Sequence, residues 1–286
     1  MAAETNTIMA SNLAKVRSLD FGLQFTGSLK SFNDAIGVTR KLKVVDGTAL
    51  KVIKVTGELQ NGVVAEGELI PLSKYVTEDV TVGEIVLKKW RKATTAEAIL
   101  KKGYDQAVGD TTDEMVKDIR KGIRADLISG LATGTGTASG AGLQAAVADA
   151  WGKLQTLWED DAVNTVYFLN PQDVSAYLGS AQITMQNAFG MNYIENFLGM
   201  GTVVLNSGVP KGKFYATAKN NVVMYYVDVT DPALAQFELT ADETGYIGIS
   251  EYPDKDSARV VDLVMSGVTY FPERVDGIVV GTIAGE

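Results

Sequence analysis

The stretch AEGELIPLSKYVTEDVTVGEIVLKKWRKATTAEAI (65–99) changes from a β pattern to a helical pattern, and the rest of the fold can be worked out from this change. Up to Trp90 it belongs to a long β region, and a lysine-rich segment then leads into a helix predicted over 95–108. A long, lysine-studded pair of strands has little core of its own, and an isolated hairpin is marginal in water. We therefore expect this β region to depend on a partner surface.

The segment upstream, KLKVVDGTALKVIKV (41–55), extends the β region towards the N-terminus. Asp46-Gly47 separates two β-rich runs, and this dipeptide favours a tight turn with positive φ at both central residues. The sequence therefore predicts an exposed hairpin over these residues. Its lysines keep the ribbon charged and oppose unintended edge pairing; they are Lys41, Lys43, Lys51 and Lys54.

Downstream, residues 111–133 have the clearest helical pattern in the chain. Thr111 and Glu114 have the spacing of a capping box, and Gly134 is expected to end the helix. At about 1.5 Å per residue this helix is long enough to cross a whole domain. Its buried stripe is predicted to contain Met115, Val116, Ile119, Ile123, Leu127, Ile128 and Leu131.

Two segments are poor in periodic apolar residues. Residues 1–38 mix Ser, Asn, Thr and Gly with scattered apolar residues, which predicts an arm that becomes ordered only against another surface. GTGTASGAG (134–142) consists of small residues and is interpreted as a linker at a domain boundary.

The remainder of the chain alternates between helical and β patterns. An amphipathic helix over 143–158 is followed by the strand TVYFL (165–169), and Asn170-Pro171 then begins another helix. The further predicted strands are 201–205, 213–217 and 221–228, and the segment from Phe237 to Ile283 is nearly all β. These patterns define an α+β protein.

Composition excludes several classes of chemistry. The 286 residues include no cysteine and no histidine, which rules out disulfide scaffolds, thiol nucleophiles, Ser-His-Asp triads and the usual zinc sites. No apolar run approaches the length of a transmembrane helix, and the N-terminus lacks the features of a secretory signal. We expect a soluble protein that works in the cytosol of its producing cell, without a cofactor or a membrane partner.

The formal charge of -9 is unevenly distributed. Residues 1–134 hold 19 Lys/Arg and 17 Asp/Glu, whereas residues 135–286 hold 7 and 18. Many basic residues lie on or before the long helix: Lys88, Lys89, Arg91, Lys92, Lys101, Lys102, Lys117, Arg120, Lys121 and Arg124. They form either a surface that attracts nucleic-acid phosphates without reading sequence, or an ordinary solvated helix face.

Other candidate sites are weaker. Gly140, Gly142 and Ala145 fit a relaxed dinucleotide-binding pattern, but that pattern must follow a strand, and here a helix is expected before it. Asp254 and Asp256 have calcium-like spacing without the rest of a binding loop, so a β-turn is favoured. A glycosidase would need two facing carboxylates; the clustered acids are Glu159, Asp160, Asp161, Asp228, Asp231, Asp242 and Glu243, besides Asp254 and Asp256.

The order of these parts resembles the major capsid proteins of tailed bacteriophages, whose fold is named after phage Hong Kong 97 and is shared with bacterial encapsulins. Residues 65–99 are similar to that family's passage from the extended loop into the peripheral domain, with Glu66-Gly67, Ile70-Pro71 and Ser73 ahead of a strand. TVYFLNPQDVSAYL (165–178) and RVVDLVMSGVTYFPERVDGIVVGTI (259–283) resemble its axial-domain step and its final strands.

The resemblance implies a Hong Kong 97-like division of the chain. Its parts would be an N-terminal arm (1–38), an extended β-hairpin loop (39–92), a peripheral domain (93–139 and 235–266) with the spine helix 111–133, and an axial domain (140–234 and 267–286). The loop residues expected to meet neighbouring subunits are Lys41, Lys43, Asp46, Gly47, Lys51 and Lys54. The residues expected to face packaged DNA are Lys88, Lys89, Arg91, Lys92, Lys117, Arg120, Lys121 and Arg124.

The implied function is a non-enzymatic major capsid protein that assembles from hexamers and pentamers into an icosahedral head enclosing double-stranded DNA. It would act in the virion after assembly in the cytoplasm of the host bacterium, with a portal protein as a further partner. A separate scaffolding protein is expected because no long helical scaffolding segment precedes the arm, and no crosslinking Lys/Asn pair is identified. The alternatives are an encapsulin shell, a carboxylate-dependent glycosidase or a β-rich adhesion or tail-type module.

Overall fold

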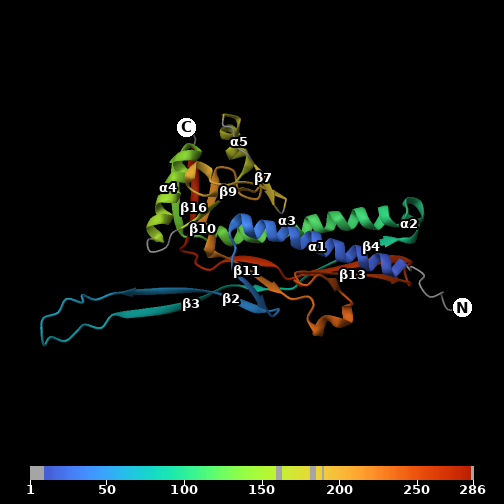
Figure 1. Cartoon of the computed structure of the whole chain (residues 1–286), viewed down its shortest axis with the longest axis horizontal. Coiled ribbons are helices and arrows are strands. Elements are labelled where there is room, and N and C mark those ends of the chain that lie inside the picture. Colours follow the sequence, from blue (N-terminus) through green and yellow to red (C-terminus); the bar gives the residue numbers. More distant parts are fainter. Residues whose placement is uncertain (1–9, 159–162, 181–184, 189, 285–286) are drawn as a thin grey trace.

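A computed structural model describes residues 10–158, 163–180, 185–188 and 190–284. Long helices run along one side of a β-sheet, a second domain rises near one end of them, and a two-stranded hairpin projects away from both (Figure 1). Among the described residues, no helix is both long and apolar enough to cross a membrane.

The helices are α1 (Ala10–Ile36), α2 (Ala96–Lys102), the π-helix η1 (Asp105–Gly109), α3 (Asp110–Leu131), α4 (Gly142–Leu157) and α5 (Pro171–Ser180), with short 3₁₀ turns at η2 (Phe197–Gly199), η3 (Lys219–Asn221) and η4 (Pro232–Phe237). The first strands are β1 (Lys41–Val44), β2 (Thr48–Glu58), β3 (Lys74–Ile85), β4 (Lys88–Thr95), β5 (Gly136–Ala141), β6 (Thr165–Leu169), β7 (Gln186–Ala188) and β8 (Met191–Ile194). The later strands are β9 (Thr202–Leu205), β10 (Lys213–Ala218), β11 (Val222–Val227), β12 (Thr240–Ala241), β13 (Ile247–Asp254), β14 (Arg259–Ser266), β15 (Thr269–Pro272) and β16 (Ile278–Ala284).

Helix α3 packs on an antiparallel sheet of order β12-β13-β14-β4. Trp90 of β4 lies opposite Val264 of β14, which in turn lies opposite Ile249 of β13, so all three side chains share one face. The predicted stripe of α3 is confirmed, since Ile123 and Leu127 are 2% and 0% exposed in the core that contains this face.

The start of α3 differs from the prediction. The helix follows η1 directly, and its N-cap residue Gly109 makes no side-chain capping bond. Instead of forming a capping box, the Thr111 hydroxyl contacts the carbonyl oxygens of Ala107 and Val108 in the preceding turn. The prediction of a capping box is therefore wrong. The turn before α3 is itself helical, and α3 continues directly from it, so the helix does not begin at a side-chain cap.

The expectation of an arm without order of its own is wrong for the described part of residues 1–38. Residues 10–36 form the 27-residue helix α1, and Phe25, Leu29, Phe32 and Ile36 are all fully or almost fully buried in the core shared with α3. Their spacing of three or four residues places them on one helical face. The many polar residues between them conceal this period in the sequence.

A seven-stranded sheet of order β5-β16-β10-β6-β9-β8-β7 forms the second domain. The predicted strand β6 is buried along its whole length. Val166 and Phe168 face the core of α1 and α3, whereas Tyr167 and Leu169 face α4 and α5. The sheet therefore connects two cores, and α4 and α5 cover one of its faces (Figure 1).

The predicted linker 134–142 is wrong, because residues 136–141 form the edge strand β5, which pairs in parallel with β16. Small residues permit this approach: a Cβ atom on Gly136 would lie 2.8 Å from the Ile278 carbonyl oxygen. Gly140 therefore lies within a strand, and Gly142 follows that strand at the start of α4. A Cβ on Gly140 would lie 2.3 Å from the Ala146 nitrogen, so this glycine serves the packing of α4 on β5.

We predict that Ile123→Asp destabilises the protein by about 4 kcal/mol or more, because it places an unpaired charge in the core. Loss of soluble expression or a large fall in the thermal midpoint measures this effect. Lys117→Asp, at an exposed position of the same helix, is the control and is expected to stay close to the parent. A normal midpoint for Ile123→Asp contradicts the assignment of the stripe.

Two glycine substitutions, which are expected to change the free energy of unfolding in opposite directions, test the packing of α4 on β5. Gly140→Ala is expected to cost about 1–3 kcal/mol, because its methyl group overlaps the backbone of α4. Gly152→Ala in α4 meets no atom within 4 Å and is expected to add about 0.5–1 kcal/mol through helix propensity. Urea denaturation measures both; equal changes in the two variants would be inconsistent with close packing at Gly140.

Candidate functional site

The projecting hairpin consists of β2 and β3, which pair with each other in a separate two-stranded sheet. A turn is present at Asp46-Gly47, with positive φ at Gly47 (+83°) but not at Asp46, and the predicted hairpin over 41–55 is wrong, because residues 41–44 do not pair with the strand after the turn. β1 instead pairs in parallel with β11 of the body. The Asp-Gly turn therefore directs the chain out of the body, and the reversal of the hairpin lies between Glu58 and Lys74.

The base of the hairpin is fixed to the body. Gly47 donates its backbone N–H to the Ile85 carbonyl (2.9 Å), and the Asp46 carboxylate accepts a hydrogen bond from Leu87 N (2.6 Å). Leu50, Ile85 and Leu87 are buried in a small core with residues of β11 and β14. The direction in which the hairpin leaves the body is thus determined by packing at its base.

The charged residues at this base make contacts within the chain. Lys43 forms an ion pair with Asp228 (2.7 Å), and this hydrogen bond raises the pKa of Lys43. Lys41 is exposed, whereas the side chains of Lys51 and Lys54 lie outside the part that the structure describes. The structure thus brings Asp46, Gly47 and Lys43 together at the root of the hairpin rather than at its far end.

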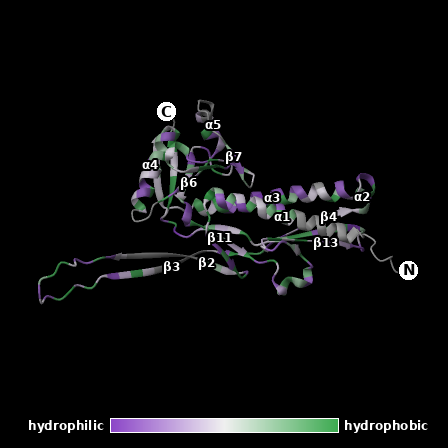
Figure 2. Cartoon of the chain, in the orientation of Figure 1, coloured by the Kyte–Doolittle hydropathy of each residue, from purple (hydrophilic) through white to green (hydrophobic). Residues whose placement is uncertain are grey.

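The far end of the hairpin is an exposed apolar surface that the sequence analysis did not single out as a site. Every described side chain from 57 to 77 is exposed except Val64, which is half-buried. Figure 2 shows both hydrophobic and hydrophilic residues at this end of the projection. The large apolar side chains of this hairpin tip (residues 57–77) include Leu59, Val63, Leu69, Ile70 and Leu72. Leu69 and Leu72 are 95% and 94% exposed. The feature of the sequence that could have indicated this surface is the apolar run ELIPL (68–72), which lies in a segment without a core of its own.

The basic residues proposed to face DNA do not form one surface. Side chains along β4 alternate between its two faces. Lys88 pairs with Asp126 of α3, and Lys92 pairs with the buried Asp262 (2.7 Å), whereas Lys89 and Arg91 lie on the opposite face. Lys88 and Lys92 are therefore engaged in contacts within the chain.

The basic residues of α3 are divided as well. Arg120 and Arg124 are partly buried, and burial lowers the pKa of both guanidinium groups. The Arg120 guanidinium lies 5.8 Å from the centre of the Phe25 ring. Lys117 and Lys121 are exposed, and Lys117 pairs with Glu114 at 2.9 Å. Only part of the predicted basic set is thus available to an external polyanion.

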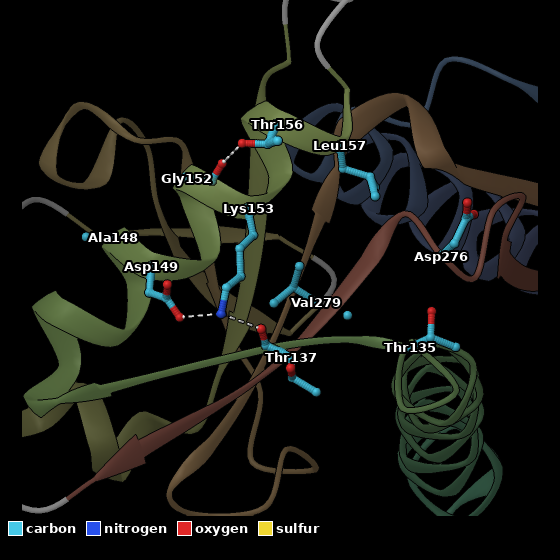
Figure 3. A pocket seen from close by; sticks show the side chains of 11 residues that line it. Thr135, Thr137, Ala148, Asp149, Gly152, Lys153, Thr156, Leu157, Asp276 and Val279 are labelled. Atoms are coloured by element: carbon cyan, nitrogen blue, oxygen red, sulfur yellow. Dashed lines mark hydrogen bonds and ion pairs between the residues drawn. The ribbon is translucent and has the colours of Figure 1, made fainter. Parts of the chain in front are cut away.

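The cavity between α4 and β5 has a volume of about 870 Å³ (Figure 3). Lys153 donates to the Thr137 carbonyl and to Asp149, both at 2.8 Å, and Asp149 accepts from Ser139 N at 3.0 Å. The hydrogen bond from Lys153 also lowers the pKa of Asp149. These two side chains satisfy backbone groups on the free edge of the sheet, which opposes pairing with a further strand.

The carboxylates considered for an enzyme make local structural contacts. Asp228 bonds to Lys43 and Thr230, Asp254 bonds to Ser257 and Arg259, and Asp242 accepts from Thr244. Glu159, Asp160 and Asp161 lie outside the described residues. Within the described ranges, no group of three or more acidic side chains could hold a metal ion.

No protein-family profile and no curated protein sequence matches the chain. Its structure is similar to a virus-like particle from Pyrococcus furiosus (TM-score 0.51, 13% identity, 92% of this chain and 99% of that one). It is also similar to the mature capsid of bacteriophage PhiM1 (0.54, 9%, 86% and 85%) and to the capsid of an empty GTA particle (0.53, 13%, 99% and 94%). The chain therefore has the Hong Kong 97-like capsid fold, an α+β fold of shell-forming proteins.

We predict that Lys92→Gln lowers stability by about 3–5 kcal/mol, because it leaves the Asp262 carboxylate, 4% exposed, without its cation. Lys89→Gln removes the same charge from the opposite face of β4 and is expected to change stability by less than about 0.5 kcal/mol. Thermal denaturation compares the two variants. Equal midpoints would show that Lys92 has no structural role.

Proposed function

We propose that this chain is the major capsid protein of a tailed bacteriophage and that it assembles into an icosahedral head around double-stranded DNA. The observation that carries the proposal is the hairpin tip: Leu59, Val63, Leu69, Ile70 and Leu72 project beyond the core of their own chain. Burial of each such side chain contributes about 1.5–3 kcal/mol. A neighbouring copy supplies the surface that this apolar tip needs.

The similarity to capsids and to a virus-like particle supports an assembly of identical subunits. In this proposal hexamers and pentamers tile the shell, with residues 39–92 as the extended loop. The peripheral domain comprises 93–139 and 235–266, and the axial domain comprises 140–234 and 267–286. A scaffolding protein and a portal protein are the further partners during assembly in the bacterial cytoplasm.

The proposed role of the basic residues is narrower than the sequence suggested. Lys121 on the exposed side of α3, together with Lys89 and Arg91, remains a candidate for contacts with DNA phosphates, whereas Lys117 pairs with Glu114. Such contacts attract a polyanion without reading its sequence. Lys88 and Lys92 are excluded from this role by their ion pairs with Asp126 and Asp262.

An encapsulin-type shell is the nearest alternative, because it shares the fold and the need for neighbouring copies. A carboxylate-dependent enzyme is the alternative from another class, and the local contacts of Asp228, Asp242 and Asp254 favour structural roles for these residues. Electron microscopy of the purified protein separates the classes: closed shells support assembly, whereas uniform monomers with hydrolase activity overturn the proposal. DNA inside shells from producing cells supports the phage head, and packaged protein supports an encapsulin.

We predict that Leu69→Ser, Ile70→Ser and Leu72→Ser, combined in one variant, abolish shell assembly while the subunit stays folded. The three side chains are 95%, 68% and 94% exposed, so their removal takes little from the core of the subunit. Size-exclusion chromatography with electron microscopy measures assembly, and thermal denaturation measures folding.

Leu100→Ser is the control for this variant, because Leu100 is also an exposed leucine, 85% accessible, but lies on α2 away from the hairpin. We expect this control to assemble like the parent. Normal assembly of the triple variant would show that the hairpin tip is not an intersubunit contact.

A further inference from the structure

A second cavity, of about 400 Å³, lies where the spine helix meets loops of the seven-stranded sheet. Lys121, Arg124 and Ala125 of α3 form one wall. The other lining residues come from residues 190–192, from Pro171 at the start of α5 and from the end of β9 with the loop after it. This volume is within the range of small-molecule sites, which usually combine apolar walls with a few polar groups.

The charged groups of this cavity have one sign. Lys121 and Arg124 line it, and no carboxylate is present among the described residues that do so. The acidic residue in the first turn of α5 is Asp173, whose carboxylate accepts a hydrogen bond from Gly212 N (2.8 Å). Arg124 is half-buried, and this burial lowers the pKa of its guanidinium group.

The walls around the two cations are held in place. Gly190 has φ +73°, a backbone conformation that favours glycine, and a Cβ atom there would lie 2.6 Å from Nη1 at the flexible end of Arg124. In the loop after β9, the Asn206 side chain accepts from Gly208 N (2.8 Å), and Asn206 N donates to the Leu169 carbonyl (2.9 Å). These two hydrogen bonds fix Asn206 at the wall of the cavity.

The lining also includes polar and apolar groups in separate places. Asn192 and Ser207 supply an amide and a hydroxyl near the cations, whereas Pro171, Met191 and Leu205 supply apolar surface. A phosphoryl group suits a lysine, a forked guanidinium and neutral donors that approach from several elements. One phosphoryl group occupies only part of the cavity, so the apolar walls have room for an attached organic group.

We propose that this cavity is a binding site for the phosphoryl group of a nucleotide, either free or at an accessible position of a nucleic-acid strand. Lys121 and Arg124 contact the phosphoryl oxygens, and Pro171, Met191 and Leu205 contact the sugar or base. The site differs from general attraction of DNA to basic residues because it is saturable and takes one nucleotide.

Isothermal titration calorimetry of the full-length protein with deoxyadenosine 5′-monophosphate tests the proposal at physiological ionic strength. We expect saturable binding that is tighter than that of inorganic phosphate. Lys121→Gln is expected to weaken binding about tenfold, because it removes one charge-assisted contact. Ala125→Glu, which adds a carboxylate to the same wall, is expected to weaken it at least as much.

Lys117→Gln is the matched control, since it removes the same charge from an exposed position one turn earlier, where the lysine pairs with Glu114. It should leave nucleotide binding unchanged. Absence of saturable binding, or equal weakening by Lys117→Gln and Lys121→Gln, overturns the proposal. The proposal is also overturned if Lys121→Gln and Ala125→Glu impair shell assembly without affecting nucleotide affinity, because the cavity is then a contact between subunits.

A single-stranded oligonucleotide with a 5′-phosphate distinguishes the two sources of the nucleotide. If its binding also depends on Lys121, the ligand is a nucleotide within a strand; if only the mononucleotide depends on Lys121, the ligand is free. Because these measurements concern affinity rather than shells, they remain informative whether or not the proposed capsid function is correct.

Discussion

Burial of one face of α3 is the constraint on which the rest of the structure depends. Its apolar stripe lies in a core with α1, with the four-stranded sheet and with Val166 and Phe168 of the seven-stranded sheet. The same helix therefore fixes the four-stranded sheet and the second domain relative to each other. A charge on this buried face would disturb the packing of both domains, whereas Lys121 lies on the exposed face of the helix.

The hairpin, in contrast to α3, leaves much of its apolar surface exposed. Its base is anchored by Leu50, Ile85 and Leu87, but its tip exposes leucines that no other part of the described chain covers. Such side chains contribute a favourable free energy only when a second surface excludes water from them. The chain thus combines a buried core with an extension whose apolar tip lies outside that core.

The ion pairs of β4 illustrate how strand geometry assigns roles to neighbouring cations. Lys88 and Lys92 point towards α3 and meet Asp126 and Asp262, whereas Lys89 and Arg91, one residue along, point away. Sequence alone presents these four residues as one basic cluster. The two-residue period of a strand divides them into a structural pair and a pair that is available at the surface.

The sequence by itself determined the periodic elements: the α3 stripe, the buried strand β6, the Asn-Pro start of α5 and the order of parts that resembles a capsid fold. It did not reveal the helix over 10–36, whose apolar residues are diluted by polar ones, or β5, whose small residues resemble a linker. Strand partners and the cavity at Lys121 and Arg124 were decided by tertiary structure, because they join residues far apart in the chain. Local patterns report which face of an element is apolar, but only the packed fold determines what that face meets.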